Sequence, residues 1–293
     1  MKRLVITGAG NLGLALYDHF KTETTYEPIL VARHSPASNK INYVTGDITL
    51  PDSMARMFHE VTPDAVIHTA ALTDVDLCEK EPKRAYTVNV EGTRNLAQLC
   101  KGEKIPLIYV STDYVFDGKK GNYTERDILN PVNVYGKTKL EGENVVKEMK
   151  GVEWNIIRTS YLFNYSCTNY DFISYVFHGL TQRKKMKIDD FRIVKPTPCS
   201  SLGAPIGRIL FNGKRGVYHL TGRDVISPYD LAIKCSLISG YDPGSIAVRG
   251  RCGEGVQRPL ISTLNTEKAE RDLDFTPPEL DDYLEAYFKM RYA

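Results

Sequence analysis

Residues 3–13 read RLVITGAGNLG, an apolar and β-branched run that leads into three glycines at the spacing G-x-G-x-x-G. The run predicts a buried strand, and the glycines predict a tight turn into a helix. Further buried-strand patterns lie at residues 28–32, 42–45, 65–69, 107–112 and 153–159. Helical patterns lie between most of them, at residues 12–21, 51–60, 81–100 and 131–150. This alternation predicts an α/β fold with a doubly wound parallel sheet, which is a Rossmann-like architecture.

The second half of the chain has a looser pattern, which suggests a smaller lobe. Aromatic residues, prolines and polar turns follow residue 160, then a strand pattern at 216–221 and helical patterns near 227–239 and 279–290. We therefore assign residues 1–163 and 203–222 to a dinucleotide-binding domain. Residues 164–202 and 223–293 are assigned to a C-terminal α/β lobe for the substrate.

The bulk composition is that of an ordinary globular protein. Of 293 residues, 42% are hydrophobic and 25% are charged, and the formal net charge is +2. There is no basic arm or nucleic-acid motif, and the first apolar run is too short for a signal peptide or membrane span. We expect a cytoplasmic protein that binds neither nucleic acid nor membranes. The six cysteines form no C-x-x-C pair, so we expect core thiols and no metal site.

The glycine-rich turn has the residues that dinucleotide binding requires. Gly8 would permit the turn, Gly10 would let a pyrophosphate approach the backbone, and Gly13 would let the helix pack closely on the strand. The start of the helix would face the negative charge of the pyrophosphate. The predicted contacts are Gly8, Gly10, Asn11, Leu12 and Gly13.

The end of the second predicted strand indicates which dinucleotide binds. Sites that prefer NAD usually carry a carboxylate there, whereas this strand ends in Arg33. An arginine can bind a 2′-phosphate through two hydrogen bonds, so we expect NADPH, with NADH as an alternative. An exposed loop cation is the other interpretation of Arg33. Asp47 follows the third strand, where it could contact adenine or cap a helix.

Tyr135 and Lys139 are four residues apart on one face of a predicted helix. A nearby ammonium and a positive nicotinamide ring would lower the pKa of the phenol, which could then give a proton to a carbonyl oxygen as hydride reaches the carbon. Tyr135 and Lys139 are thus also predicted cofactor contacts, with Lys139 at the nicotinamide ribose. Tyr17 and Lys21 share this spacing, and we interpret them as helix surface or packing. Tyr135 differs because its helix follows the strand that ends at Thr112, where ligands of doubly wound sheets bind. The Thr112 hydroxyl could bind the substrate oxygen or cap backbone.

Two stretches resemble the dTDP-4-dehydrorhamnose reductase family of extended short-chain dehydrogenases: residues 111–118, STDYVFDG, and residues 131–143, PVNVYGKTKLEGE. Agreement continues at residues 70–76, 88–93, 158–161, 258–259 and 262–266. The resemblance implies a catalytic trio of Thr112, Tyr135 and Lys139. It implies reduction by NADPH of the 4-keto group of a dTDP-linked 6-deoxyhexulose to give dTDP-L-rhamnose.

The resemblance implies further ligand contacts and makes the smaller lobe a sugar-nucleotide lobe. The additional cofactor contacts would be Asp47, Ile48, Ala70, Ala71, Thr73 and Asn89. The substrate contacts would be Thr112, Asp113, Phe116, Tyr161 and Arg258, with Arg258 at the diphosphate. Core packing is the alternative for Phe116 and Tyr161.

The sequence also departs from the family pattern. The glycine turn is one residue shorter, Tyr161 stands where tryptophan is usual, and residues 190–197 are longer and more basic than the usual D-Q-x-G-x-P-T. Asp171-Phe172 replaces an Asn-Phe pair. A reductase or epimerase of another nucleotide-linked deoxysugar therefore stays open. So does a non-catalytic NADP-binding subunit similar to the methionine adenosyltransferase beta subunit. A homodimer is compatible with the sequence.

Overall fold

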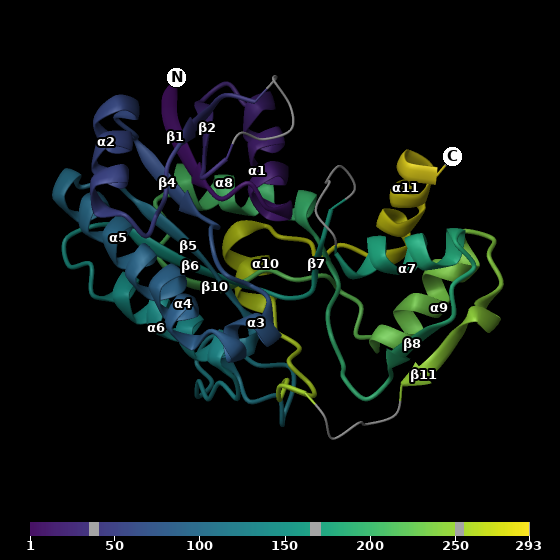
Figure 1. Cartoon of the computed structure of the whole chain (residues 1–293). Helices are drawn as coiled ribbons and strands as arrows, with labels where there is room; N and C mark the ends of the chain where they lie inside the picture. Colours follow the sequence, from purple (N-terminus) through teal and green to yellow (C-terminus); the bar gives the residue numbers. More distant parts are fainter. Residues whose placement is uncertain (35–40, 165–170, 250–254, 293) are drawn as a thin grey trace.

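The structure, a computed structural model, describes residues 1–34, 41–164, 171–249 and 255–292 (Figure 1). Seven strands form a sheet in the order β10-β6-β5-β4-β1-β2-β3, and all of its pairs are parallel. Its strands are β1 (Lys2–Thr7), β2 (Tyr26–Ala32), β3 (Tyr43–Thr45), β4 (Ala65–His68), β5 (Leu107–Thr112), β6 (Trp154–Thr159) and β10 (Gly216–His219). After β1 the chain adds β2 and β3 on one side of β1, and it then returns to place β4 on the other side of β1. The prediction of a doubly wound parallel sheet is confirmed.

Helices cover both faces of this sheet (Figure 1). Alternate residues of β1 point to opposite faces: Leu4 and Ile6 belong to one core cluster and Val5 to the other. The first cluster includes α1 (Asn11–Thr22), α8 (Gly203–Asn212) and α10 (Glu267–Leu273). The second includes α2 (Pro51–Val61), α5 (Gly92–Glu103) and α6 (Val134–Lys147). Residues 267–273 thus pack on the large sheet, although they fall in the range that we assigned to the smaller lobe.

The single helix predicted over residues 81–100 is wrong in detail. The segment folds as α3 (Val75–Lys80), α4 (Pro82–Tyr86), a π-helical turn η1 (Thr87–Glu91) and α5. Pro82 has no backbone N–H and therefore begins a helix rather than continuing one. The π-turn matters for the site because it directs Asn89 inward, where the side chain is 1% exposed.

The smaller lobe has its own core beside the large sheet (Figure 1). It consists of α7 (Phe172–Thr181), α9 (Pro228–Ile238), α11 (Leu280–Tyr292) and a parallel pair, β8 (Met186–Asp189) with β11 (Ile246–Arg249). The short elements β7 (Leu162–Phe163), β9 (Thr197–Pro198) and η3 (Cys199–Leu202) lie between the lobe and the sheet domain along the chain. The turn η2 (Asp113–Val115) follows β5, and η4 (Pro243–Ser245) precedes β11. The sequence pattern did not predict α7, β8 or β11.

A buried ionic network ties together the elements that carry the predicted site. Arg158 on β6 binds both carboxylate oxygens of Glu143 on α6 at 2.8 Å. Ser111 on β5 donates to the same carboxylate at 2.7 Å, and the Arg158 guanidinium also lies 3.3 Å from Nε2 of His219 on β10. Because each partner lies on a different element, the network fixes α6 against three neighbouring strands.

The described cysteines Cys78, Cys100, Cys199 and Cys235 are buried free thiols, as expected of core fillers. Cys167 and Cys252 lie outside the described residues. Of the helices within the described ranges, none has the length and apolar character that crossing a bilayer requires.

Candidate active site

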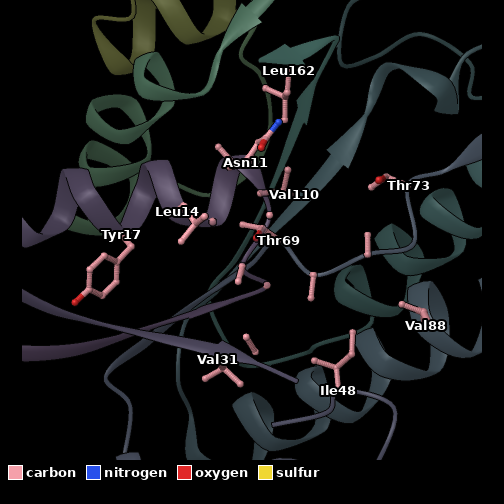
Figure 2. Close-up of a pocket in the computed structure, with 18 of the residues that line it drawn as sticks. Asn11, Leu14, Tyr17, Val31, Ile48, Thr69, Thr73, Val88, Val110 and Leu162 are labelled. Carbon is pink, nitrogen blue, oxygen red and sulfur yellow. The ribbon is translucent and has the colours of Figure 1, made fainter. Parts of the chain in front are cut away.

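A cleft of about 1420 Å³ opens along the carboxyl ends of the central strands. Its lining comes from the glycine-rich turn, the ends of β2, β4, β5 and β6, and the first turns of α6 and α7. Figure 2 shows Asn11, Leu14 and Tyr17 along the α1 wall, with Val31 and Ile48 below them. The cleft lies where the strand order reverses between β1 and β4, which is the usual ligand site of such a sheet.

The glycine-rich turn fits a dinucleotide pyrophosphate. Gly8 has a φ of +94°, and a Cβ on Gly13 would lie 1.8 Å from the Gly8 carbonyl oxygen, so both positions require glycine. A Cβ on Gly10 would meet no atom within 4 Å, so this glycine borders open cleft. The first turn of α1 has no side-chain cap and no acidic residue. Its free amides and positive dipole end therefore suit an anion.

Asn11 connects this turn to the smaller lobe. Its backbone oxygen accepts from Asn164 Nδ2 at 2.9 Å, and its own Nδ2 lies 3.4 Å from the carboxylate of Asp171, the N-cap of α7. Its Oδ1 is buried without a hydrogen-bond partner among the described residues. A buried unsatisfied oxygen on a cleft wall favours a ligand or water that donates to it.

Two cations line the far end of the cleft. Arg33 is exposed there after β2, and Lys21 lines the same cleft from the last turn of α1. Tyr17 is buried and its hydroxyl accepts from the backbone N–H of Asn42 at 2.7 Å, which agrees with a packing role. Lys21 was interpreted as helix surface or packing, yet it lies four residues after Tyr17 on α1 and lines the cleft.

Asp47 holds the turn before α2 and does not cap that helix, whose N-cap is Leu50. One carboxylate oxygen accepts from the backbone N–H of Thr49 at 2.9 Å and from its hydroxyl at 2.7 Å. This holds the turn before α2, so that Asp47 and Ile48 line the cleft. A contact with adenine stays a prediction.

The structure brings Thr112, Tyr135 and Lys139 together in the cleft lining. Tyr135 is in the first turn of α6, whose N-cap residue Asn133 accepts from the Gly136 N–H at 2.8 Å. A Cβ on Gly136 would lie 2.2 Å from the Tyr114 carbonyl oxygen. Because Gly136 has no Cβ, the first turn of α6 packs closely on the segment that follows β5. This packing places Tyr135 beside Thr112.

The electrostatics of the pair differ from the expectation. Burial raises the pKa of Tyr135 above its ordinary value, while the Thr112 hydroxyl acts in the opposite direction and the charge of Asp113 adds to the rise. The Lys139 ammonium donates to the Val110 carbonyl at 2.7 Å, and burial lowers its pKa to about 7, against the opposing charge of Glu143. In the protein alone, the expected lowering of the phenol pKa by Lys139 is therefore wrong.

Residues 1–292 match the sequence profile of the RmlD substrate binding domain family. The chain belongs to this family. It is 34% identical over 241 residues to a dTDP-4-dehydrorhamnose reductase of Aggregatibacter actinomycetemcomitans, which covers 80% of this chain and 78% of the relative. It is 28% identical to the methionine adenosyltransferase 2 subunit beta of Rattus norvegicus over 92% of this chain and 82% of that protein. The fold resembles dTDP-4-dehydrorhamnose reductase of Bacillus anthracis in complex with NADP, with a TM-score of 0.85, 28% identity and coverage of 98% and 99%.

Two residues that the family resemblance placed at ligands are buried supports. Asn89 does not line the cleft of the described residues: its Oδ1 accepts from the Leu72 N–H at 2.8 Å, and its Nδ2 donates to the Thr138 hydroxyl at 3.0 Å. It thereby joins the loop that carries Ala70, Ala71 and Thr73 to α6. Phe116 is fully buried and stacks on Tyr123 with 4.3 Å between ring centroids, so the predicted sugar contact is replaced by core packing.

Two predicted substrate residues of this RmlD-family chain have charged or polar partners of their own. Asp113 is 3% exposed and is bonded by hydroxyl groups. Its predicted contact with substrate stays a prediction. Arg258 pairs with the Asp76 carboxylate at 2.8 Å and donates to the Val256 carbonyl at 3.2 Å, outside the cleft lining. Its predicted contact with a diphosphate stays a prediction.

The side of the site toward the smaller lobe joins the predicted residue Tyr161 to residues that were not predicted, Phe172 and Arg192. Tyr161 lines the cleft with a φ of +47°, an unusual backbone conformation for a tyrosine, and packs on Phe172. Arg192, within the altered segment 190–197, pairs with Asp189 and lies 3.3 Å from the Tyr114 hydroxyl. The Tyr114 ring contacts Tyr135 edge-on at 5.6 Å. The sequence signalled Arg192 only through the longer and more basic segment at residues 190–197, which departs from the family pattern.

Proposed function

We propose that the chain is an NADPH-dependent reductase of a dTDP-linked 4-keto-6-deoxyhexose, which converts dTDP-4-dehydro-L-rhamnose into dTDP-L-rhamnose. The observation that carries this proposal is the presence of Thr112, Tyr135 and Lys139 in the same cleft as the glycine-rich turn. NADPH bound along that turn would supply the hydride. The family of sugar reductases to which the chain belongs supports the choice of a keto sugar.

Tyr135 would act as the general acid. Reduction of a ketone to an alcohol needs one hydride and one proton, and the raised pKa keeps the phenol in the protonated form that can donate. Thr112 would orient the phenol and the carbonyl oxygen. Lys139 would contact the cofactor ribose and, when charged, stabilise the phenolate that remains.

Arg33 and Lys21 support NADPH over NADH. Both line the end of the cleft that follows β2, where the adenosine half of a dinucleotide lies in doubly wound sheets. Two cations there suit a 2′-phosphate, and no carboxylate follows Arg33 on the described part of that segment.

An assay of NADPH absorbance with dTDP-4-dehydro-L-rhamnose tests the proposal. We expect oxidation of NADPH by the parent protein and loss of kcat by about 10³-fold in Tyr135→Phe, with unchanged NADPH binding. NADPH binding without any oxidation at high protein concentration would refute this activity.

A non-catalytic NADP-binding subunit is the second candidate. The likeness to the beta subunit of methionine adenosyltransferase 2 over 92% of this chain favours it, as does the altered segment at residues 190–197. The predicted trio argues against it, because binding alone has no chemical need for these three groups. An inactive protein that still binds NADPH and forms a complex with a methionine adenosyltransferase catalytic subunit would support this second candidate.

A further inference from the structure

Asp113 is a buried carboxylate directly behind the predicted catalytic trio. It follows Thr112 at the end of β5 and is 3% exposed. Its Oδ2 accepts hydrogen bonds from Ser160, which follows β6, at 2.9 Å and from Ser262 in the C-terminal segment. Its Oδ1 lies 3.0 Å from the Thr112 hydroxyl. Its described partners are therefore three hydroxyl groups from three separate segments.

Counting hydrogens fixes the direction of the bond between Thr112 and Asp113. A carboxylate has no hydrogen to give, so an ionised Asp113 can only accept from Thr112. Burial raises the pKa of Asp113, and the hydrogen bonds from the three hydroxyl groups act against that rise and favour the ionised form. The Thr112 oxygen already accepts from the backbone N–H of Tyr114 at 3.2 Å. Thr112 has a single hydroxyl hydrogen, and a charged acceptor binds it more strongly than a neutral phenol does.

We propose that Asp113 is a positioning residue that takes the Thr112 hydroxyl hydrogen and so leaves an oxygen lone pair of Thr112 facing the phenol of Tyr135. A Thr112 hydroxyl that donates to the phenol lowers the pKa of Tyr135, whereas a Thr112 hydroxyl whose hydrogen is held by Asp113 accepts from the phenol instead. For catalysis the inference rests on the proposed function, because a protonated phenol is the form that carbonyl reduction uses. The hydrogen-bond direction itself does not depend on the substrate.

The other groups around the phenol act in the same direction as this arrangement. The titratable groups that face Tyr135 from other elements are Asp113, Tyr114, Cys78 and Tyr109. The charged forms of Asp113, Tyr114 and Cys78 raise the pKa of the phenol, and Tyr109 interacts with it electrostatically. Lys139, on the same helix, donates one of its three hydrogens to Val110. Thr112 could also stabilise a phenolate by donating to it, and Asp113 prevents that donation.

The variant Asp113→Asn changes this in either orientation of the new amide. An NH₂ group toward Thr112 would donate to its oxygen and turn the hydroxyl hydrogen toward the phenol. An oxygen toward Thr112 would keep the bond but remove the negative charge near Tyr135. Both outcomes stabilise the phenolate, so the pKa of Tyr135 falls.

The test is the pH profile of kcat for reduction in the parent, in Asp113→Asn and in Asp117→Asn. Reduction needs the protonated phenol, so activity declines as pH rises through the pKa of Tyr135. We expect the decline to move down by about one pH unit in Asp113→Asn. Asp117→Asn makes the same change to an acid that is bonded to Tyr123 instead, and should leave the profile in place. An unmoved profile in Asp113→Asn, or an equal movement in both variants, would overturn the inference.

Thr112→Val shows whether Asp113 acts through Thr112. In a Thr112→Val background the hydroxyl route is gone, so Asp113→Asn should shift the profile by less than half as much as in the parent. A shift of the same size in both backgrounds would contradict the proposed route.

A measurement without substrate separates this inference from the proposed function. The tyrosinate absorbance of the NADP⁺-bound protein, minus that of Tyr135→Phe, follows ionisation of this phenol alone. We expect the midpoint to be about one unit lower in Asp113→Asn than in the parent. If the parent oxidised no NADPH with the keto sugar, the proposed function would fail, but this titration would still test the role of Asp113. Equal midpoints in the parent and in Asp113→Asn would refute that role.

Discussion

The glycine-rich turn of the cleft is made of backbone from six consecutive residues, 8–13, whereas the end that holds Tyr135 is made of side chains from distant segments. At the first end, Gly8 and Gly13 need only the contact between β1 and α1. At the second, the N-cap of α6 is itself fixed by a bond from Asn133 Nδ2 to the Gln257 carbonyl at 2.9 Å. A local site can be recognised from residue spacing, because residues adjacent in the sequence determine its geometry. A site assembled over long separations also depends on supports that carry no motif.

Removing one buried support should have the largest effect on stability. Glu143→Ala leaves the Arg158 guanidinium, 1% exposed, without its carboxylate partner. We expect the free energy of unfolding to fall by about 3–5 kcal/mol, because an unpaired buried charge remains. Chemical denaturation measures the difference.

Glu141→Ala is the matched control for this variant, since Glu141 is an exposed residue of the same helix. We expect a change within about 0.5 kcal/mol. Similar losses in both variants would mean that α6 is not held by the ionic network, and the contrast between the two ends of the cleft would be weaker than described.

Two glycines of the turn should separate folding from ligand binding. A Cβ on Gly13 would overlap the Gly8 carbonyl, so Gly13→Ala should displace the turn and weaken NADPH binding by about 100-fold. A Cβ on Gly10 meets open cleft, so Gly10→Ala should leave thermal unfolding unchanged and weaken NADPH binding by about tenfold. Fluorescence titration gives the dissociation constants. If Gly10→Ala bound NADPH as the parent does, the pyrophosphate would not lie against this turn.

Sequence patterns predicted the features whose cause is local. The strands of the sheet, the glycine-rich turn and the placement of Thr112 with Tyr135 follow from periodicity and from the rule for strand ends. Asn89, Asp113 and Phe116 were assigned to ligands. The partners of Asn89 at Leu72 and Thr138, and those of Asp113 at Ser160 and Ser262, lie 17 or more residues away, and Phe116 lies in the core, where no spacing signals these contacts. Lys21 at the cleft and Arg192 beside the Tyr114 hydroxyl were missed for the same reason, because such a cation is brought to its place only through the packing of its helix or loop.

The smallest expected effect concerns Arg33, the most exposed of the predicted cofactor contacts at the adenosine end. Arg33→Ala should raise the Kd for NADPH about tenfold and leave the Kd for NADH unchanged, since only NADPH carries the 2′-phosphate and a charge-assisted hydrogen bond contributes about 1.5–3 kcal/mol. We expect the loss of binding free energy to lie at the lower limit of that range, because solvent screens the charge of Arg33 and because Lys21, which lines the same cleft, stays in place. Arg56→Ala, an exposed arginine on α2, controls for the change in net charge. Equal effects of Arg33→Ala on both dinucleotides would identify Arg33 as a loop cation and leave Lys21 as the cation to test for the choice of NADPH.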